Sequence, residues 1–198
     1  MTAIGLDRVL ELVRGEFPGA GTPSEEDVET LEAQLGRPHR GDILVASRCP
    51  HGRPAVLLTV PFASSTGPTP PLLWLACPHA ARGVGVLESE GAVSMMASRL
   101  DSDALVRSRL QSDEERLTRL VAGISVMASG PAAREAFRDR GIAWGRKGSV
   151  KCLHAHLAFA LASGAPRGAG RSIGEWCAGV LDERGGVWCE RIPATCLY

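Results

Sequence analysis

Apolar and polar positions alternate with helical spacing at the start of the chain. Residues 6–17 place apolar side chains on one face and predict an amphipathic helix. The members of that face are Leu6, Val9, Leu10 and Val13. A second helix is predicted over residues 24–35, because Ser24 followed by acidic residues is an N-cap signal and Gly36 with Pro38 stops it.

The pattern then changes to short unbroken apolar runs. Residues 42–47, 55–60 and 72–76 each form such a run, bounded by glycine and proline. These runs predict strands, and their close spacing predicts a small antiparallel sheet of about three strands. The segment 61–71 is rich in Ser, Thr, Gly and Pro, so a hairpin loop is expected there.

Helical spacing returns after Cys77 and continues almost to the end of the chain. We expect helices over residues 78–90, 93–124 with a break near 101–103, 131–140, a segment from Cys152 to Gly164, and 173–181. A run of strands followed by helices predicts a single α+β domain. We divide it into an N-terminal helical extension and linker (1–23), an α+β domain (24–165), and a C-terminal helix and tail packing on the same domain (166–198).

Composition and charge narrow the class of protein. The chain of 198 residues carries 22 basic and 22 acidic side chains, so its formal net charge is zero. This balance argues against a dedicated nucleic-acid binder. No apolar run is long enough to span a membrane, and residues 1–17 lack the pattern of a signal peptide, so we expect a cytoplasmic protein. Its six cysteines therefore favour metal or thiol chemistry over disulfides.

Three of the cysteines have a histidine two residues later. The pairs are Cys49 with His51, Cys77 with His79, and Cys152 with His154. About 0.15 such pairs are expected from random placement, so the pattern indicates a function. The last pair begins a predicted helix, where unpaired N–H groups and the neighbouring Lys151 favour a thiolate. His156 shares the helix face of Cys152.

These residues predict a shared site. We expect Cys49, Cys77 and Cys152 to converge, with His154 as a fourth ligand or an acid–base group. Soft thiolate ligands suit zinc or an iron–sulfur cluster. A small anionic substrate is expected to contact Arg48, Lys151 and His156, and the candidate catalytic residues are Cys152, His154 and Lys151.

The chain also resembles the DUF501 proteins, an uncharacterised bacterial family. Four motifs carry the resemblance: Gln34–Pro38, Arg48–Pro54, Trp74–Pro78 and Val150–His156. The resemblance covers roughly residues 24–165. The resemblance implies functional weight on Arg48, Cys49, Pro54, Cys77, Pro78, Lys151, Cys152 and His154, and less on His51 and His79. No activity is implied by the family.

The same residues are also consistent with other interpretations. The three cysteines are also compatible with small buried hydrophobes, and Cys152 with a metal-free nucleophile that uses a histidine as base. A non-catalytic module that binds a protein partner is a further alternative. The glycine-rich segment 141–148 is interpreted either as a flexible connector or as a loop that binds an anion. The sequence assigns no role to Cys177, Cys189 and Cys196.

Overall fold

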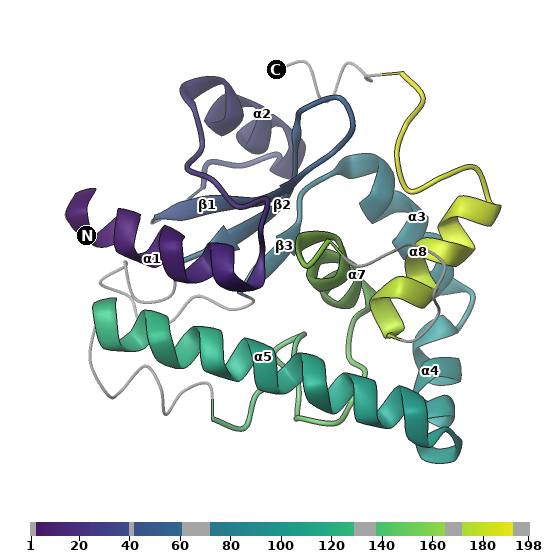
Figure 1. Ribbon diagram of the computed structural model, residues 1–198. Helices are drawn as coiled ribbons and strands as arrows, with labels where there is room; N and C mark the ends of the chain where they lie inside the picture. The colour runs from purple at the N-terminus through teal and green to yellow at the C-terminus, as the bar shows by residue number, and fades with distance from the viewer. Residues whose placement is uncertain (1–2, 40–41, 61–71, 129–137, 165–171, 192–198) are drawn as a thin grey trace.

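The computed structural model describes residues 3–39, 42–60, 72–128, 138–164 and 172–191. Within these ranges the chain forms seven helices and one three-stranded sheet (Figure 1). The elements are α1 (Ala3–Glu16), α2 (Glu25–Leu35), β1 (Ile43–Arg48), β2 (Pro54–Thr59), β3 (Leu73–Leu75), α3 (Pro78–Ser89), α4 (Ala92–Ser102), α5 (Ala104–Ala128), α7 (Leu153–Ala162) and α8 (Ile173–Glu183). The predicted α+β class is confirmed.

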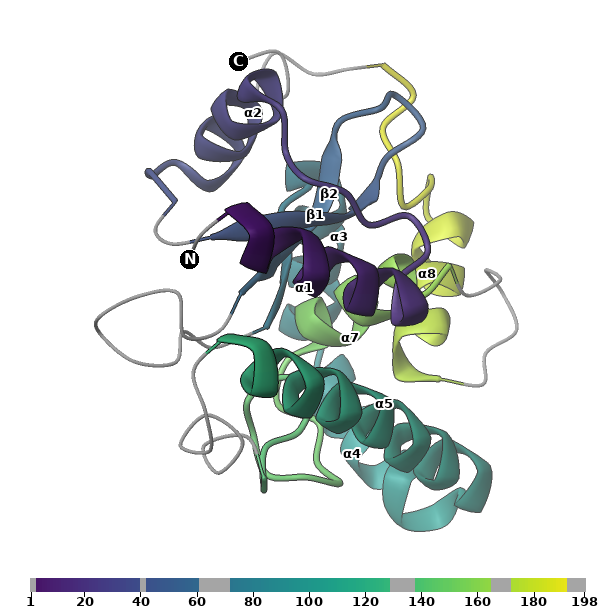
Figure 2. The same cartoon turned by 60° about the vertical axis from the view of Figure 1, so that its left-hand side comes forward.

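The sheet is antiparallel in the order β1-β2-β3, as predicted. Its register pairs Val45 with Leu57 and Leu57 with Trp74. Helix α2 lies over one face of the sheet, and α1 and α7 lie over the other, in both views (Figures 1 and 2). The large core lies on the α1 and α7 side, and a smaller apolar cluster lies beneath α2.

Helix α7 is the most deeply buried helix of the described core. Eight of its side chains are buried, and its composition is apolar around the whole circumference, which is typical of a central helix. It packs closely on α8, because a Cβ added at Gly174 would lie 2.1 Å from the carbonyl oxygen of His156. The first turn of α7 therefore holds its side chains in a fixed position relative to α3 and α8.

The N-terminal segment packs into the main core. Val9 and Val13 on α1 and Phe17 directly after it are almost fully buried, and the ring of Phe17 meets that of Phe159 edge-on at 5.7 Å. Gly21 also pairs with Val45 on β1 through two backbone hydrogen bonds of 2.9 Å. The segment expected as an extension thus covers part of α7.

Local signals placed most element boundaries correctly. Ser24 is the N-cap of α2, as predicted, and it forms a capping box with Asp27. The predicted break between α4 and α5 falls at Asp103. The predicted loop 61–71 and most of the predicted helix 131–140 lie outside the described residues. None of the described helices is long and apolar enough to cross a membrane.

Candidate functional site

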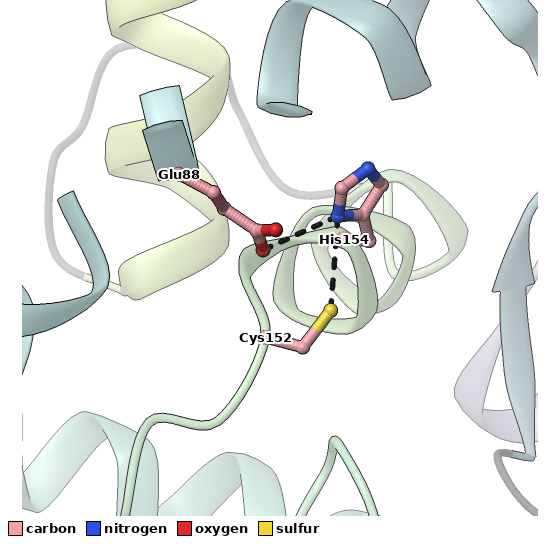
Figure 3. Close-up of side chains that lie close together, drawn as sticks. All are labelled: Glu88, Cys152 and His154. Atoms are coloured by element: carbon pink, nitrogen blue, oxygen red, sulfur yellow. Dashed lines mark hydrogen bonds and ion pairs between the residues drawn. The ribbon is translucent and has the colours of Figure 1, made fainter. Parts of the chain in front are cut away.

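Three side chains from two helices meet at the start of α7 (Figure 3). Cys152 is the N-cap residue of α7, and His154 lies in the first turn of the same helix. Glu88 comes from the last turn of α3. The ligand atoms of the three residues all lie within 4.8 Å of one another. All three side chains are partly exposed, so a small molecule or ion from solvent can reach them.

The imidazole of His154 is the centre of this cluster. Its Nδ1 lies 3.7 Å from the Cys152 sulfur and 3.2 Å from the Glu88 Oε1 (Figure 3). Its Nε2 lies 3.0 Å from the carbonyl oxygen of Ala81. A carbonyl oxygen only accepts, so Nε2 carries a hydrogen and donates it there. The ring is thereby fixed with Nδ1 facing the thiol and the carboxylate.

Electrostatics favour a cation between these groups. The pKa of His154 is raised to about 9, chiefly by its hydrogen bond to Cys152 and also by the negative charge of Glu88, which together outweigh burial. In the metal-free protein at neutral pH, His154 is therefore an imidazolium whose Nδ1 proton lies between sulfur and carboxylate.

Glu88 also explains how the helix begins. Cys152 makes no side-chain capping hydrogen bond, although an N-cap residue usually does. The backbone N–H of Leu153 instead donates to Glu88 Oε1 at 2.6 Å. A carboxylate at a helix N-terminus also interacts favourably with the helix dipole. The same oxygen atom thus caps α7 and faces His154.

Two of the three separations between the ligand atoms, sulfur to Nδ1 and Nδ1 to Oε1, match those around a tetrahedral metal ion. Bonds of about 2.3 Å to sulfur and about 2.1 Å to nitrogen and oxygen, at tetrahedral angles, put S and N about 3.6 Å apart and N and O about 3.4 Å apart. The observed separations are 3.7 Å and 3.2 Å. A histidine ligand usually donates its other N–H to a carbonyl or carboxylate, as His154 does to Ala81.

The structure brings together only two of the four predicted metal ligands, Cys152 and His154. The cluster with Glu88 is the one such group found in the described ranges, so Cys49 and Cys77 do not join it. Cys77 is buried at the N-cap of α3, at the opposite end from Glu88. Eleven helical residues separate the two backbones by about 16 Å. Cys49 lies at the turn between β1 and β2.

The predicted substrate-binding residues have different surroundings. Arg48 forms a bidentate ion pair with Asp27, with both N–O distances 2.6 Å, and thereby joins the β1–β2 turn to α2. Lys151 is exposed next to Cys152. His156 is 4% exposed, and its Nε2 has no hydrogen-bond partner in the described structure. Burial lowers its pKa to about 4, so His156 is neutral at pH 7.

The other two Cys-x-His pairs hold the segment after α8. His51 Nε2 lies 2.8 Å from the carbonyl oxygen of Cys189, and His79 Nε2 lies 3.2 Å from that of Gly186. Both histidines therefore serve as donors to the same stretch of backbone. Their repeated motif reflects a shared packing role, which the sequence pattern does not distinguish from metal ligation.

Two further features of the sequence acquire a structural explanation. In the segment 141–148, the backbone N–H of Gly148 donates to both oxygens of the buried Glu114, at 2.9 and 3.1 Å. The anion at this loop is thus a carboxylate of the chain itself.

Cys177 is fully buried, and burial raises the pKa of its thiol to about 12, so it packs as a small hydrophobe. Cys196 lies outside the described residues.

Glu88 is the site residue that the sequence did not reveal. It is one of three charged residues on the predicted helix 78–90, and no local pattern links it to Cys152. Only the packing of α3 against α7 places it there.

The fold and the cluster define a small α+β protein with a Cys–His–Glu site at the start of a buried helix. The family described as "Protein of unknown function (DUF501)" matches residues 45–178, about two thirds of the chain. The chain belongs to this family, which confirms the resemblance seen in its motifs. All three cluster residues fall within the matched range, whereas the motif Gln34–Pro38 precedes it. Neither a curated protein nor a solved structure matches the chain.

Proposed function

We propose that this protein binds one divalent transition-metal ion, with zinc as the best fit, through Glu88, Cys152 and His154. The observation that carries the proposal is the convergence of three groups that, once deprotonated, are all acceptors. With the thiol deprotonated, a proton on the histidine is the one donor within the three side chains, and the backbone N–H of Leu153 donates to Oε1 from outside them. A cation is needed among them, and a metal ion supplies it with bonds to all three.

The donor set favours a mononuclear site over an iron–sulfur cluster. Clusters are held mainly by several cysteine thiolates, whereas this site offers one thiolate, one imidazole and one carboxylate. Zinc accepts all three ligand types in tetrahedral geometry.

Three protein ligands leave the fourth tetrahedral position for water or substrate. This arrangement is typical of catalytic zinc sites, in which the metal acidifies a bound water or polarises a substrate oxygen. Lys151 is exposed beside Cys152 and adds positive charge near the site. A small anionic molecule is therefore the ligand class that we propose for the open position.

Metal analysis of protein purified without oxygen tests the proposal. We expect one zinc per chain, and we expect the cobalt-substituted protein to show a thiolate-to-metal charge-transfer band. Cys152→Ser should abolish that band and the bound metal. Cys49→Ser is the matched control, because Cys49 is also a partly exposed free cysteine but lies outside the cluster. Equal metal loss in both variants, or full retention in Cys152→Ser, would contradict the assignment.

A metal-free thiol site is the second candidate. Cys152 lies at the N-terminus of α7 with His154 Nδ1 3.7 Å from its sulfur, an arrangement that favours a nucleophilic thiolate. This function predicts no bound metal and rapid alkylation of Cys152 relative to Cys49. His154→Gln should then slow alkylation of Cys152 at least about tenfold. Unchanged alkylation in that variant would exclude the thiol–imidazole pair.

A further inference from the structure

A small apolar pocket lies on the face of the sheet that carries α2, away from the Cys–His–Glu cluster. Its volume is about 120 Å³. The apolar walls come from each strand of the sheet and from the end of α2: Ile43, Leu57, Trp74 and Leu35. These residues belong to the smaller of the two apolar clusters. Helix α2 covers only part of this face (Figure 1).

The size of the pocket sets the size of its ligand. An apolar cavity of about 150 Å³ accommodates benzene. A volume of about 120 Å³ is slightly smaller, but the pocket is open to solvent on one side. A single six-membered ring or a short branched chain therefore fits inside, with a polar group at the mouth.

Two polar side chains of the pocket, Trp74 and Arg37, have no acceptor among the described residues, whereas His39 lies 3.2 Å from Glu32 and Thr59 donates to the carbonyl of Leu72. The indole nitrogen of Trp74 is buried and has no hydrogen-bond acceptor among the described residues. An unpaired buried N–H costs free energy and is rare in native structures. Arg37 lies at the rim, with its guanidinium 5.5 Å from the centre of the Trp74 ring. No carboxylate pairs with Arg37 in the part of the chain that the structure describes.

We propose that this pocket binds a small monocarboxylic acid with a single-ring or short branched apolar body. The apolar body packs against Ile43, Leu57 and Trp74, and the carboxylate lies at the mouth beside Arg37. The ligand supplies the negative charge that Arg37 lacks. The site is distinct from the proposed metal site, and its occupancy does not depend on Cys152.

Benzoate is a suitable probe, because its ring matches the volume and its carboxylate matches the donors. Ligand-observed NMR and calorimetry on the full chain should show one benzoate per chain, with a Kd of about 1 mM or tighter. Benzyl alcohol, which has the same ring and no charge, should bind at least about tenfold more weakly.

Three variants locate the binding. Arg37→Gln should weaken benzoate binding about tenfold, and Trp74→Phe, which replaces the two-ring indole by a single ring and so removes part of the apolar wall, should weaken it several-fold. Cys152→Ser should leave it unchanged. Arg37 is exposed, so its substitution does not threaten folding, and circular dichroism verifies that.

Several results would overturn the proposal: no binding at millimolar benzoate, equal binding of benzyl alcohol, or unchanged affinity in Arg37→Gln. Loss of benzoate binding in Cys152→Ser would assign the carboxylate to the metal site instead. A failure of zinc binding leaves the pocket proposal intact, because the two tests use different variants.

Discussion

Two histidines on the first turns of α7 are expected to titrate in opposite directions in the metal-free protein. The pKa of His154 is raised from 6.5 to about 9, and that of His156 is lowered from 6.5 to about 4. The cause differs: His154 contacts a thiol and a carboxylate, whereas His156 is desolvated in the core. Their effects on the free energy of unfolding therefore fall in separate pH ranges.

For His154 the folded state holds the proton more tightly than the unfolded state. Its contribution is fully present below pH 6.5 and is lost as pH rises through about 9. The full shift corresponds to about 3 kcal/mol, and the partial exposure of the side chain reduces this to about 1 to 2 kcal/mol. His154→Gln, which keeps a donor for the Ala81 carbonyl, should remove this alkaline loss of stability.

For His156 the unfolded state holds the proton more tightly. Its contribution is present above pH 6.5 and is lost as pH falls toward 4. The expected loss between pH 7 and pH 5 is about 2 kcal/mol. His156→Leu should remove it without breaking a hydrogen bond, because Nε2 has no partner in the described structure.

Urea unfolding in EDTA at pH 5, 7 and 9 measures both effects, and NMR titration of the two imidazole rings gives the pKa values directly. The wild-type difference between pH 7 and 9 should shrink only in His154→Gln. The difference between pH 7 and 5 should shrink only in His156→Leu. Parallel changes in both variants, or rings that both titrate near 6.5, would refute the assignment of these environments.

Three further predictions concern stability. Gly174→Ala should destabilise the protein by at least about 2 kcal/mol in urea unfolding, because its Cβ would lie 2.1 Å from the His156 carbonyl oxygen. As a control, a Cβ at Gly15 on α1 meets no atom, so Gly15→Ala should be neutral or stabilising by up to about 1 kcal/mol. Asp27→Asn should cost about 1 to 2 kcal/mol at pH 7 and much less near pH 2, because Arg48 lowers the pKa of Asp27 to about 2 and the wild-type stabilisation is lost as pH falls from about 4 through 2. The same free-energy difference between wild type and variant at both pH values would contradict the ion pair. Glu88→Gln should weaken the metal-free fold by about 1 kcal/mol in urea unfolding and should also weaken metal binding in titration calorimetry. Cys49→Ser, outside the cluster, should leave metal binding unchanged.

The fold was predictable where its signals are local. The capping box at Ser24, the break at Asp103 and the glycine and proline boundaries of the strands each depend on a few neighbouring residues. The packing of the N-terminal segment against Phe159 depends on contacts between residues that are distant in the sequence. For that reason the sequence predicted the segment 1–23 to be an extension.

The site was predictable only in part, for the same reason. Cys152 and His154 are two residues apart, so their pairing is visible in the sequence. Glu88 reaches them only because α3 packs against α7, and no spacing of residues along the sequence predicts that contact. The motifs at Cys49 and Cys77 share the Cys-x-His spacing, but their histidines donate to the backbone of residues 186 and 189. Identical local patterns thus take different roles once the chain folds.

The start of α7 links the site to the fold. A helix that is mostly buried satisfies its first N–H groups largely from within the protein, and Glu88 does so for Leu153. That requirement brings a carboxylate to within 3.2 Å of the imidazole of His154, beside a cysteine. Three acceptor groups so close repel one another unless a cation lies among them. A proton on His154 is the smallest cation that fulfils this condition, and a metal ion competes with it for the same place. The need to cap a core helix and the capacity to bind a metal therefore arise from one arrangement of three residues.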